Sequence, residues 1–191
     1  MLGSLRKGIP KFTGSMTALI TPFDNGELDL NSFRNIVKHQ IDNGTTGLIP
    51  VGTTGESPTL SHYEHEKIVE VCIEESSGKV SVIAGAGSNS TSEACALASH
   101  AGKAGADAVL VVTPYYNKPT QSGLYSHFMA VADAAKVPVI VYDIPGRSVK
   151  KISSELLIKL SKIPNIVGVK DATSDLAAPM NVIQNCGKKF I

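Results

Sequence analysis

The sequence has almost no net charge and no long apolar segment. Its 18 lysines and arginines against 17 aspartates and glutamates leave a formal charge of +1. This balance excludes the strongly basic surface that is typical of proteins that bind nucleic acids or anionic membranes. No apolar run approaches the ~20 residues that a membrane-spanning helix needs. We therefore expect neither a nucleic acid nor a membrane as a partner.

Cysteine is scarce as well. Cys72, Cys95 and Cys186 lie far apart and form no Cys-x-x-Cys pair. An odd number of scattered thiols favours a reducing compartment over a disulfide framework. Residues 1–14 are basic and lack the apolar segment of a secretory signal. These features together predict a cytoplasmic protein.

A metal site is not indicated either. His62 and His65 have a spacing that occurs in zinc sites, but the sequence offers no third ligand beside them. They also fall on the polar side of an expected helix, where a closed four-ligand zinc site does not form. We therefore expect no metal ion.

What the chain does contain is a regular alternation of apolar strands and helical segments. Expected strands begin near residues 14, 47, 80, 107, 137 and 165, which is roughly the thirty-residue spacing of one strand–helix unit. We expect one domain over residues 1–191, with a leader at 1–13 and a loop at 23–28. The last residues, 190–191, can begin a seventh strand.

Capping signals mark where several helices start. Asp29 is expected to cap a helix over residues 30–43. Ser61 with Glu64, and Ser90 with Glu93, each have the spacing of a capping box. Further helices are expected over residues 123–136, from Ser153 or Ser154 onwards, and over 176–185.

Two α/β architectures fit this alternation. A doubly wound sheet usually carries a glycine-rich phosphate loop after its first strand, whereas this strand ends in Thr-Pro-Phe. In a (β/α)8 TIM barrel, polar chemistry gathers at the carboxyl ends of the strands, and polar residues follow the strands here. We favour the TIM barrel. The chain supplies about six units, so we expect the last two to be missing at its C-terminal end.

Lys170 is the most informative single residue. It ends the apolar strand 165–170, and both neighbouring segments look helical, so the strand is expected to be fully buried in a parallel sheet. A lysine in such a place tends to lose its proton and become a nucleophile toward carbonyls. The alternative is a lysine whose side chain simply reaches water from the strand end.

Other strand ends decide between these readings, because they supply partners for such an amine. Tyr142 ends the neighbouring strand and is suited to proton transfer. Thr53 and Thr54 lie in a glycine-flanked turn that is suited to a carboxylate, and Arg147 can bind a second carboxylate with two hydrogen bonds. Together they favour a Schiff-base site at Lys170.

Four segments carry a resemblance to a known family: residues 52–56 (GTTGE), 113–117 (TPYYN), 142–147 (YDIPGR) and 166–172 (IVGVKDA). In order and spacing they resemble the dihydrodipicolinate synthase family, within the pyruvate-dependent class I aldolases that include N-acetylneuraminate lyase. The resemblance runs from Phe12 to the end of the chain.

The resemblance implies a lyase that condenses pyruvate with L-aspartate 4-semialdehyde to 4-hydroxy-tetrahydrodipicolinate, in lysine and diaminopimelate biosynthesis. It implies that Lys170 forms the imine and that Tyr142, Thr53 and Tyr116 relay protons. Thr53 and Thr54 then bind the pyruvate carboxylate, and Arg147 binds that of the aldehyde. No cofactor is implied, because the lysine is the electron sink. Tyr116 is implied to enter a neighbouring subunit's site, in a homodimer or homotetramer.

Some members of the family are inhibited by lysine. The positions involved correspond here to Ser57, His62, His65, Asn89, Glu93 and Tyr115. Pro58 departs from the alanine often found beside that serine, Asp143 replaces a common asparagine, and Asp171 a common glutamate.

Two alternatives to the synthase remain open. One is another pyruvate-dependent aldolase, such as N-acetylneuraminate lyase or a 2-keto-3-deoxy sugar-acid aldolase. Arg147 counts against it, since sugar-acid lyases generally lack that cation. The other is an inactive truncated remnant, because the family's last two strands supply a glycine and a carbonyl near the pyruvate.

Overall fold

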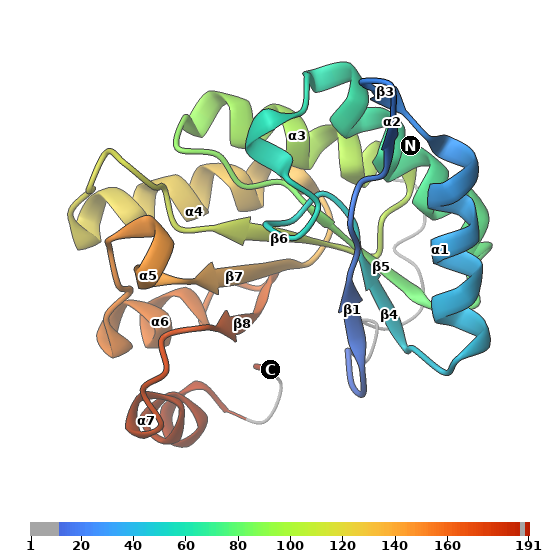
Figure 1. Cartoon of the computed structure of the whole chain (residues 1–191). Helices are drawn as coiled ribbons and strands as arrows, with labels where there is room; N and C mark the ends of the chain where they lie inside the picture. Colours follow the sequence, from blue (N-terminus) through green and yellow to red (C-terminus); the bar gives the residue numbers. More distant parts are fainter. Residues whose placement is uncertain (1–11, 188–189) are drawn as a thin grey trace, which may run out of the picture.

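The computed structural model describes residues 12–187 and 190–191. The chain forms a curved, six-stranded parallel sheet with the strand order β1-β4-β5-β6-β7-β8. Helices cover the outer face of this sheet (Figure 1). The strands are β1 Met16–Ala18, β4 Gly47–Ile49, β5 Ser81–Gly85, β6 Ala108–Val112, β7 Val139–Asp143 and β8 Ile166–Asp171. The predicted alternation and the partial barrel are confirmed.

Six helices connect or follow these strands. They are α1 Leu30–Asp42, α2 His62–Ser76, α3 Thr91–Ala104, α4 Gln121–Ala135, α6 Ser154–Leu160 and α7 Ala177–Cys186. There are also shorter elements: the hairpin of β2 Phe23–Asp24 and β3 Glu27–Leu28, the 3₁₀ helix η1 Ser57–Thr59, and α5 Pro145–Ser148. The loop expected over residues 23–28 is therefore a hairpin, closed by its Asp-Asn-Gly turn.

Strands β4 to β8 each contribute to two separate apolar cores, whereas β1 contributes only to the inner one. Along β7, Val139 and Val141 face the helices, while Ile140 and Tyr142 belong to a smaller cluster on the inner face. This alternation follows from the two-residue period of a strand. Phe12 joins the inner cluster. It is therefore buried in the fold, whereas residues 1–11 of the leader expected at 1–13 lie outside the described part.

Two of the three predicted helix caps are confirmed. The Asp29 side chain accepts a hydrogen bond from the Ser32 amide, and Ser61 with Glu64 forms a complete capping box. The capping box expected at Ser90 is wrong, because the Ser90 side chain makes no capping hydrogen bond. The carboxylate of Glu93 is engaged elsewhere, by Ser88 and His62.

The last strand is less buried than expected. Ile166 to Gly168 are buried, but Val169 and Lys170 are partly exposed. Unlike the inner strands, β8 pairs along its length only with β7 among the described strands. At its other edge, Ile191 donates a hydrogen bond to the Val167 carbonyl (2.9 Å) and accepts one from the Val169 amide (2.7 Å). These two bonds have the parallel pattern expected of a seventh strand.

Candidate functional site

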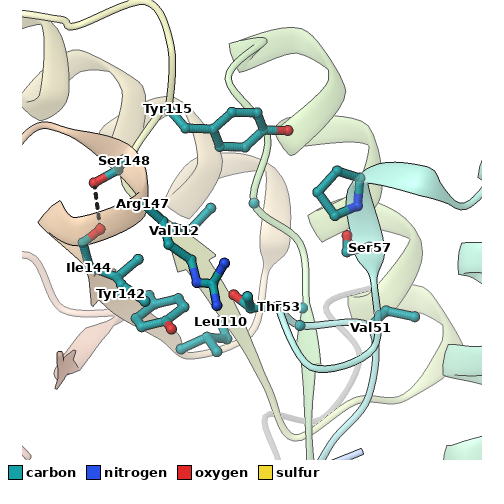
Figure 2. Close-up of a pocket in the computed structure, with 14 residues that line it drawn as sticks. Val51, Thr53, Ser57, Leu110, Val112, Tyr115, Tyr142, Ile144, Arg147 and Ser148 are labelled. Atoms are coloured by element: carbon teal, nitrogen blue, oxygen red, sulfur yellow. Dashed lines mark hydrogen bonds between the residues drawn. The ribbon is translucent and has the colours of Figure 1, made fainter. Parts of the chain in front are cut away.

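A cavity of about 250 Å³ opens at the carboxyl ends of β4, β5, β6 and β7. Its wall includes the apolar side chains of Leu110, Val112 and Ile144, and polar side chains project into it from the loops (Figure 2). The position agrees with the rule that β/α barrels carry their sites at the strands' carboxyl ends.

Tyr142 and Lys170 are direct neighbours on adjacent strands, because the register of β7 and β8 pairs them. The Nζ atom of Lys170 lies over the Tyr142 ring, 4.4 Å from its centre. The Thr113 amide and hydroxyl both donate to the Tyr142 carbonyl, at 2.9 and 3.2 Å, and hold this strand end. Tyr142 lines the cavity, whereas Lys170 lies beside it, beyond the tyrosine.

The turn after β4 places Thr53 at the cavity. The Gly55 and Glu56 amides donate to the carbonyls of Gly52 and Thr53, which closes the turn. The turn fits closely against β5, since a Cβ atom added at Gly85 would lie 2.1 Å from the Val51 carbonyl oxygen. Only glycine allows this approach.

The two threonines of that turn differ in position. Both are exposed, but Thr53 lines the cavity and Thr54 does not. Arg147, from the short helix α5, also lines it, and Figure 2 shows its guanidinium pointing toward Thr53. The structure therefore brings Thr53, Tyr142 and Arg147 to one cavity.

The two tyrosines of the TPYYN segment differ in their environment. Tyr115 lines the cavity, while Tyr116 is 87% exposed and has a left-handed backbone (φ 69°). Such a backbone is uncommon for a bulky residue, and the Tyr116 side chain does not line the cavity. Tyr116 is therefore not part of the cavity within a single copy of the chain.

The positions that correspond to a lysine-inhibitor site fall into three places. Ser57 and Tyr115 line the cavity, and Asn89 donates to the Asn117 side chain (3.2 Å). The Nε2 of His62 lies 2.7 Å from Oε1 of Glu93. The hydroxyl of Ser88 donates to the other carboxylate oxygen, and this bond, followed by that from His62, lowers the pKa of Glu93.

His65 is the buried member of that set. It is 3% exposed, and burial lowers its pKa to about 4 against the smaller, opposite influence of the Gly85 backbone. The ring is therefore neutral at physiological pH. Within the described part of the chain, neither ring nitrogen has a hydrogen-bond partner of good geometry. The residue packs into the fold as an uncharged ring, near the His62–Glu93 pair.

Sequence reasoning missed several residues of the cavity. Ser148, Ile144 and the two glycines Gly85 and Gly87 line it. The glycines had a visible signal, since they form a Gly-x-Gly after a strand, but that pattern indicates a nucleotide loop only weakly. Their actual role is close packing: a Cβ atom at Gly87 would lie 2.6 Å from the Val112 amide nitrogen.

Residues 12–187 and 190–191 contain neither a cluster of metal ligands nor a membrane-spanning helix. No group of three His, Cys, Asp or Glu side chains in these ranges could hold a metal ion. No helix among them is long and apolar enough to cross a membrane.

A curved parallel β/α sheet with its polar cavity at the strands' carboxyl ends defines part of a (β/α)8 barrel. More specifically, the chain belongs to the Dihydrodipicolinate synthetase family, whose sequence profile matches residues 11–191. It is 62% identical over 182 residues to a 4-hydroxy-tetrahydrodipicolinate synthase of Rhodopseudomonas palustris, covering 95% of this chain and 62% of that relative.

Solved structures agree with this assignment. The chain superposes on dihydrodipicolinate synthase from Aquifex aeolicus with a TM-score of 0.92 and 46% identity, covering 94% of this chain and 61% of that one. The enzyme of Cyanidioschyzon merolae with lysine bound gives a TM-score of 0.87 and 41% identity, covering 90% and 59%. The chain thus spans about three fifths of the length of the relatives it matches.

Proposed function

We propose that this chain forms an imine between Lys170 and pyruvate and condenses it with L-aspartate 4-semialdehyde to give 4-hydroxy-tetrahydrodipicolinate. The single observation that carries the proposal is the pairing of Tyr142 with Lys170 in the sheet. It sets a proton-transfer group against an amine at the carboxyl end of two adjacent strands. Membership of the family supports the choice of substrates.

In the proposed reaction, the neutral Lys170 amine attacks the keto carbon of pyruvate to form a carbinolamine. Tyr142 and Thr53 deliver and remove the protons needed to expel water and leave the imine. Loss of a methyl proton gives an enamine, whose carbon attacks the aldehyde. The amine of the second substrate then displaces Lys170 by transimination and closes the ring. The lysine itself accepts the electron pair, so no cofactor is required.

Arg147 is proposed to bind the carboxylate of the aldehyde substrate, because its guanidinium points into the cavity. A planar guanidinium binds a carboxylate through two parallel hydrogen bonds. Arg147→Ala is expected to raise KM for the aldehyde by roughly 10- to 100-fold and to leave imine formation unchanged. If Arg147→Ala lost the same amount of activity toward aspartate semialdehyde and toward a sugar-acid substrate, the result would favour a different aldolase.

Tyr116 is proposed to complete the relay from a neighbouring copy of the chain, in a dimer or a pair of dimers. Its 87% exposure within one copy supports this role, since an isolated chain leaves the ring with little to pack against. Tyr116→Ser is expected to lower turnover only in the assembled protein. Full turnover in a protein that sedimentation shows to be a monomer would contradict the proposal.

Thr54 is proposed to hold the pyruvate carboxylate together with Thr53 through the backbone N–H groups of their turn.

Lysine is proposed to bind where Ser57, Tyr115 and the His62–Glu93 pair lie, a region that offers a carboxylate and hydroxyls for its charged ends. Calorimetric titration with millimolar lysine tests this second proposal, and no heat with an assembled protein would refute it.

A cytoplasmic location is also proposed. Its support is chemical: the three cysteines are all free thiols, and burial raises the pKa of Cys72 to about 12. Free cysteines without disulfide partners are typical of proteins in a reducing compartment.

Borohydride trapping tests the central proposal. The chain is incubated with pyruvate and borohydride, digested and mapped by mass spectrometry. The label is expected on Lys170 and is expected to disappear in Lys170→Arg but not in Lys162→Arg, an exposed lysine after α6. A label distributed over surface lysines, or none in a folded protein, would refute the assignment.

A further inference from the structure

Asp143 is a buried carboxyl group directly beside the proposed site. It ends β7, next to Tyr142, and is 2% exposed. Because Val139 and Val141 face the helices, the alternation along the strand places Asp143 on that side as well. Its Oδ2 accepts a hydrogen bond from the Ile152 amide (3.2 Å), and Oδ1 has no partner among the described residues.

This hydrogen bond closes the loop that carries Arg147. Residues 144–151 leave β7 and return to it at Ile152, so the bond joins the two ends of the loop. Inside it, the Ser148 hydroxyl contacts the carbonyls of Ile144 and Lys150, both at 3.0 Å. The Asp143 backbone is fixed too, since its carbonyl accepts from the Ala172 amide (2.9 Å).

The charges around Asp143 come from two packed segments. Asp171, its register partner on β8, opposes ionisation, and Lys151, in the loop, favours it. Burial is the largest influence, and with Asp171 it raises the pKa of Asp143 to about 6, against the hydrogen bond from Ile152. Lys151 is in turn paired with Asp175 at 2.7 Å. The carboxyl group therefore changes charge near pH 6.

We infer that Asp143 is a positioning residue whose ionised carboxylate holds Ile152 and so fixes the loop that presents Arg147. Protonation converts a charge-assisted hydrogen bond into a weaker neutral one. The loop then loosens, and Arg147 binds a substrate carboxylate less well. The second half of this inference rests on the proposed function, and the first half does not.

Replacing Asp143 with asparagine removes the charge of the side chain and keeps its shape. An amide oxygen still accepts from Ile152, but it is neutral at every pH, so Asp143→Asn imitates the protonated form. Asp171→Asn is the matched variant, since it removes the opposing charge and leaves Asp143 able to titrate. Asp171 is exposed and lines no part of the cavity.

The first experiment follows backbone amide resonances between pH 4.5 and 8, a range that extends to both sides of the expected midpoint, as a linked proton requires. Ile152 and Arg147 are expected to shift together with a midpoint near 6 in the unmodified chain, and to show no such step in Asp143→Asn. In Asp171→Asn the midpoint is expected to fall. A midpoint near 4 in the unmodified chain, or a step that survives in Asp143→Asn, would overturn the inference. If Asp143→Asn fails to fold, the midpoint in Asp171→Asn decides.

The second experiment measures KM for aspartate semialdehyde in the unmodified chain and in Asp143→Asn across the same range. At pH 8 the variant's KM is expected to exceed that of the unmodified chain by about threefold to tenfold, and at pH 5 the two values converge. A constant ratio would indicate a merely structural role and refute the coupling to Arg147. Absence of any turnover counts against the proposed function alone, because the resonance experiment needs no substrate.

Discussion

Replacing Gly85 with alanine is expected to destabilise the chain and disturb the turn that carries Thr53. The added Cβ would lie 2.1 Å from the Val51 carbonyl oxygen, and also 3.0 Å from the Gly52 amide nitrogen. Since real Cβ atoms essentially never approach another heavy atom within 3.0 Å, β5 and the turn must separate by about 1 Å. The hydrogen bond from the Gly85 amide to the Pro50 carbonyl (3.0 Å) is lost in the process.

The cost follows from these two effects. Forcing extra volume into a packed site costs about 1–3 kcal/mol, and the lost hydrogen bond about 1 kcal/mol more. For a chain of this length, such a loss lowers the melting temperature by roughly 5–15 °C. Pyruvate trapping is expected to fall with it, because Thr53 follows directly on the displaced residues.

Thermal unfolding followed by circular dichroism measures the effect. Gly146→Ala is the matched control, because a Cβ atom there meets nothing within 4 Å. That control is expected to melt within about 2 °C of the unmodified chain. If Gly85→Ala melts as the control does and traps pyruvate equally well, the close approach of β5 to the turn is not required and the reasoning fails.

Three further predictions concern caps, protons and the site. Ser61→Ala removes a capping bond and is expected to cost about 1 kcal/mol in urea unfolding, whereas Ser90→Ala costs little, since Ser90 makes no such bond; equal losses would contradict this. Burial lowers the pKa of His65 and His127 to about 4, so the unfolded chain binds more protons between pH 4 and 6.5. Stability is then lost as pH falls through this window. The raised pKa of Asp143 has the opposite effect, but two histidines outweigh one carboxyl group, so the free energy of unfolding is expected to change by about 1.4 kcal/mol per pH unit between pH 5 and 6. Urea titrations that show no dependence on pH in this range would refute the prediction. Tyr142→Phe keeps the ring under the lysine and removes the hydroxyl, so kcat is expected to fall about 10²- to 10⁴-fold with little change in KM, and an unchanged kcat in steady-state assays would exclude the relay.

Much of the fold could be predicted because local patterns and tertiary packing agree. The repeated strand–helix spacing, the Asp29 cap and the capping box at Ser61 all depend on neighbouring residues, and all are present in the structure. The box expected at Ser90 failed for a non-local reason. Ser88 and His62 compete for the Glu93 carboxylate, and His62 is 31 residues away in the sequence.

The candidate site was predictable in part. Strand ends pointed to Thr53, Tyr142 and Arg147, and these three meet at one cavity. The burial of β8 was overestimated, because an apolar run does not reveal how many neighbours a strand has. The role of Asp143 was also not visible, since its burial depends on how a loop of several residues folds back on the strand. The roles of Thr54 and Tyr116 stay predictions.

The order of the strands has a consequence for how the chain comes to fold. From β4 onward, every strand of the large sheet pairs with the next one along the chain, and β1 pairs with β4 across a single helical connection. Each pairing therefore closes one short loop, and no strand waits for a distant partner. As synthesis proceeds from the N-terminus, each new strand emerges after the strand with which it pairs. The residues that line the cavity are therefore all synthesised before Lys170, and Lys170 can reach Tyr142 only once β8 has emerged.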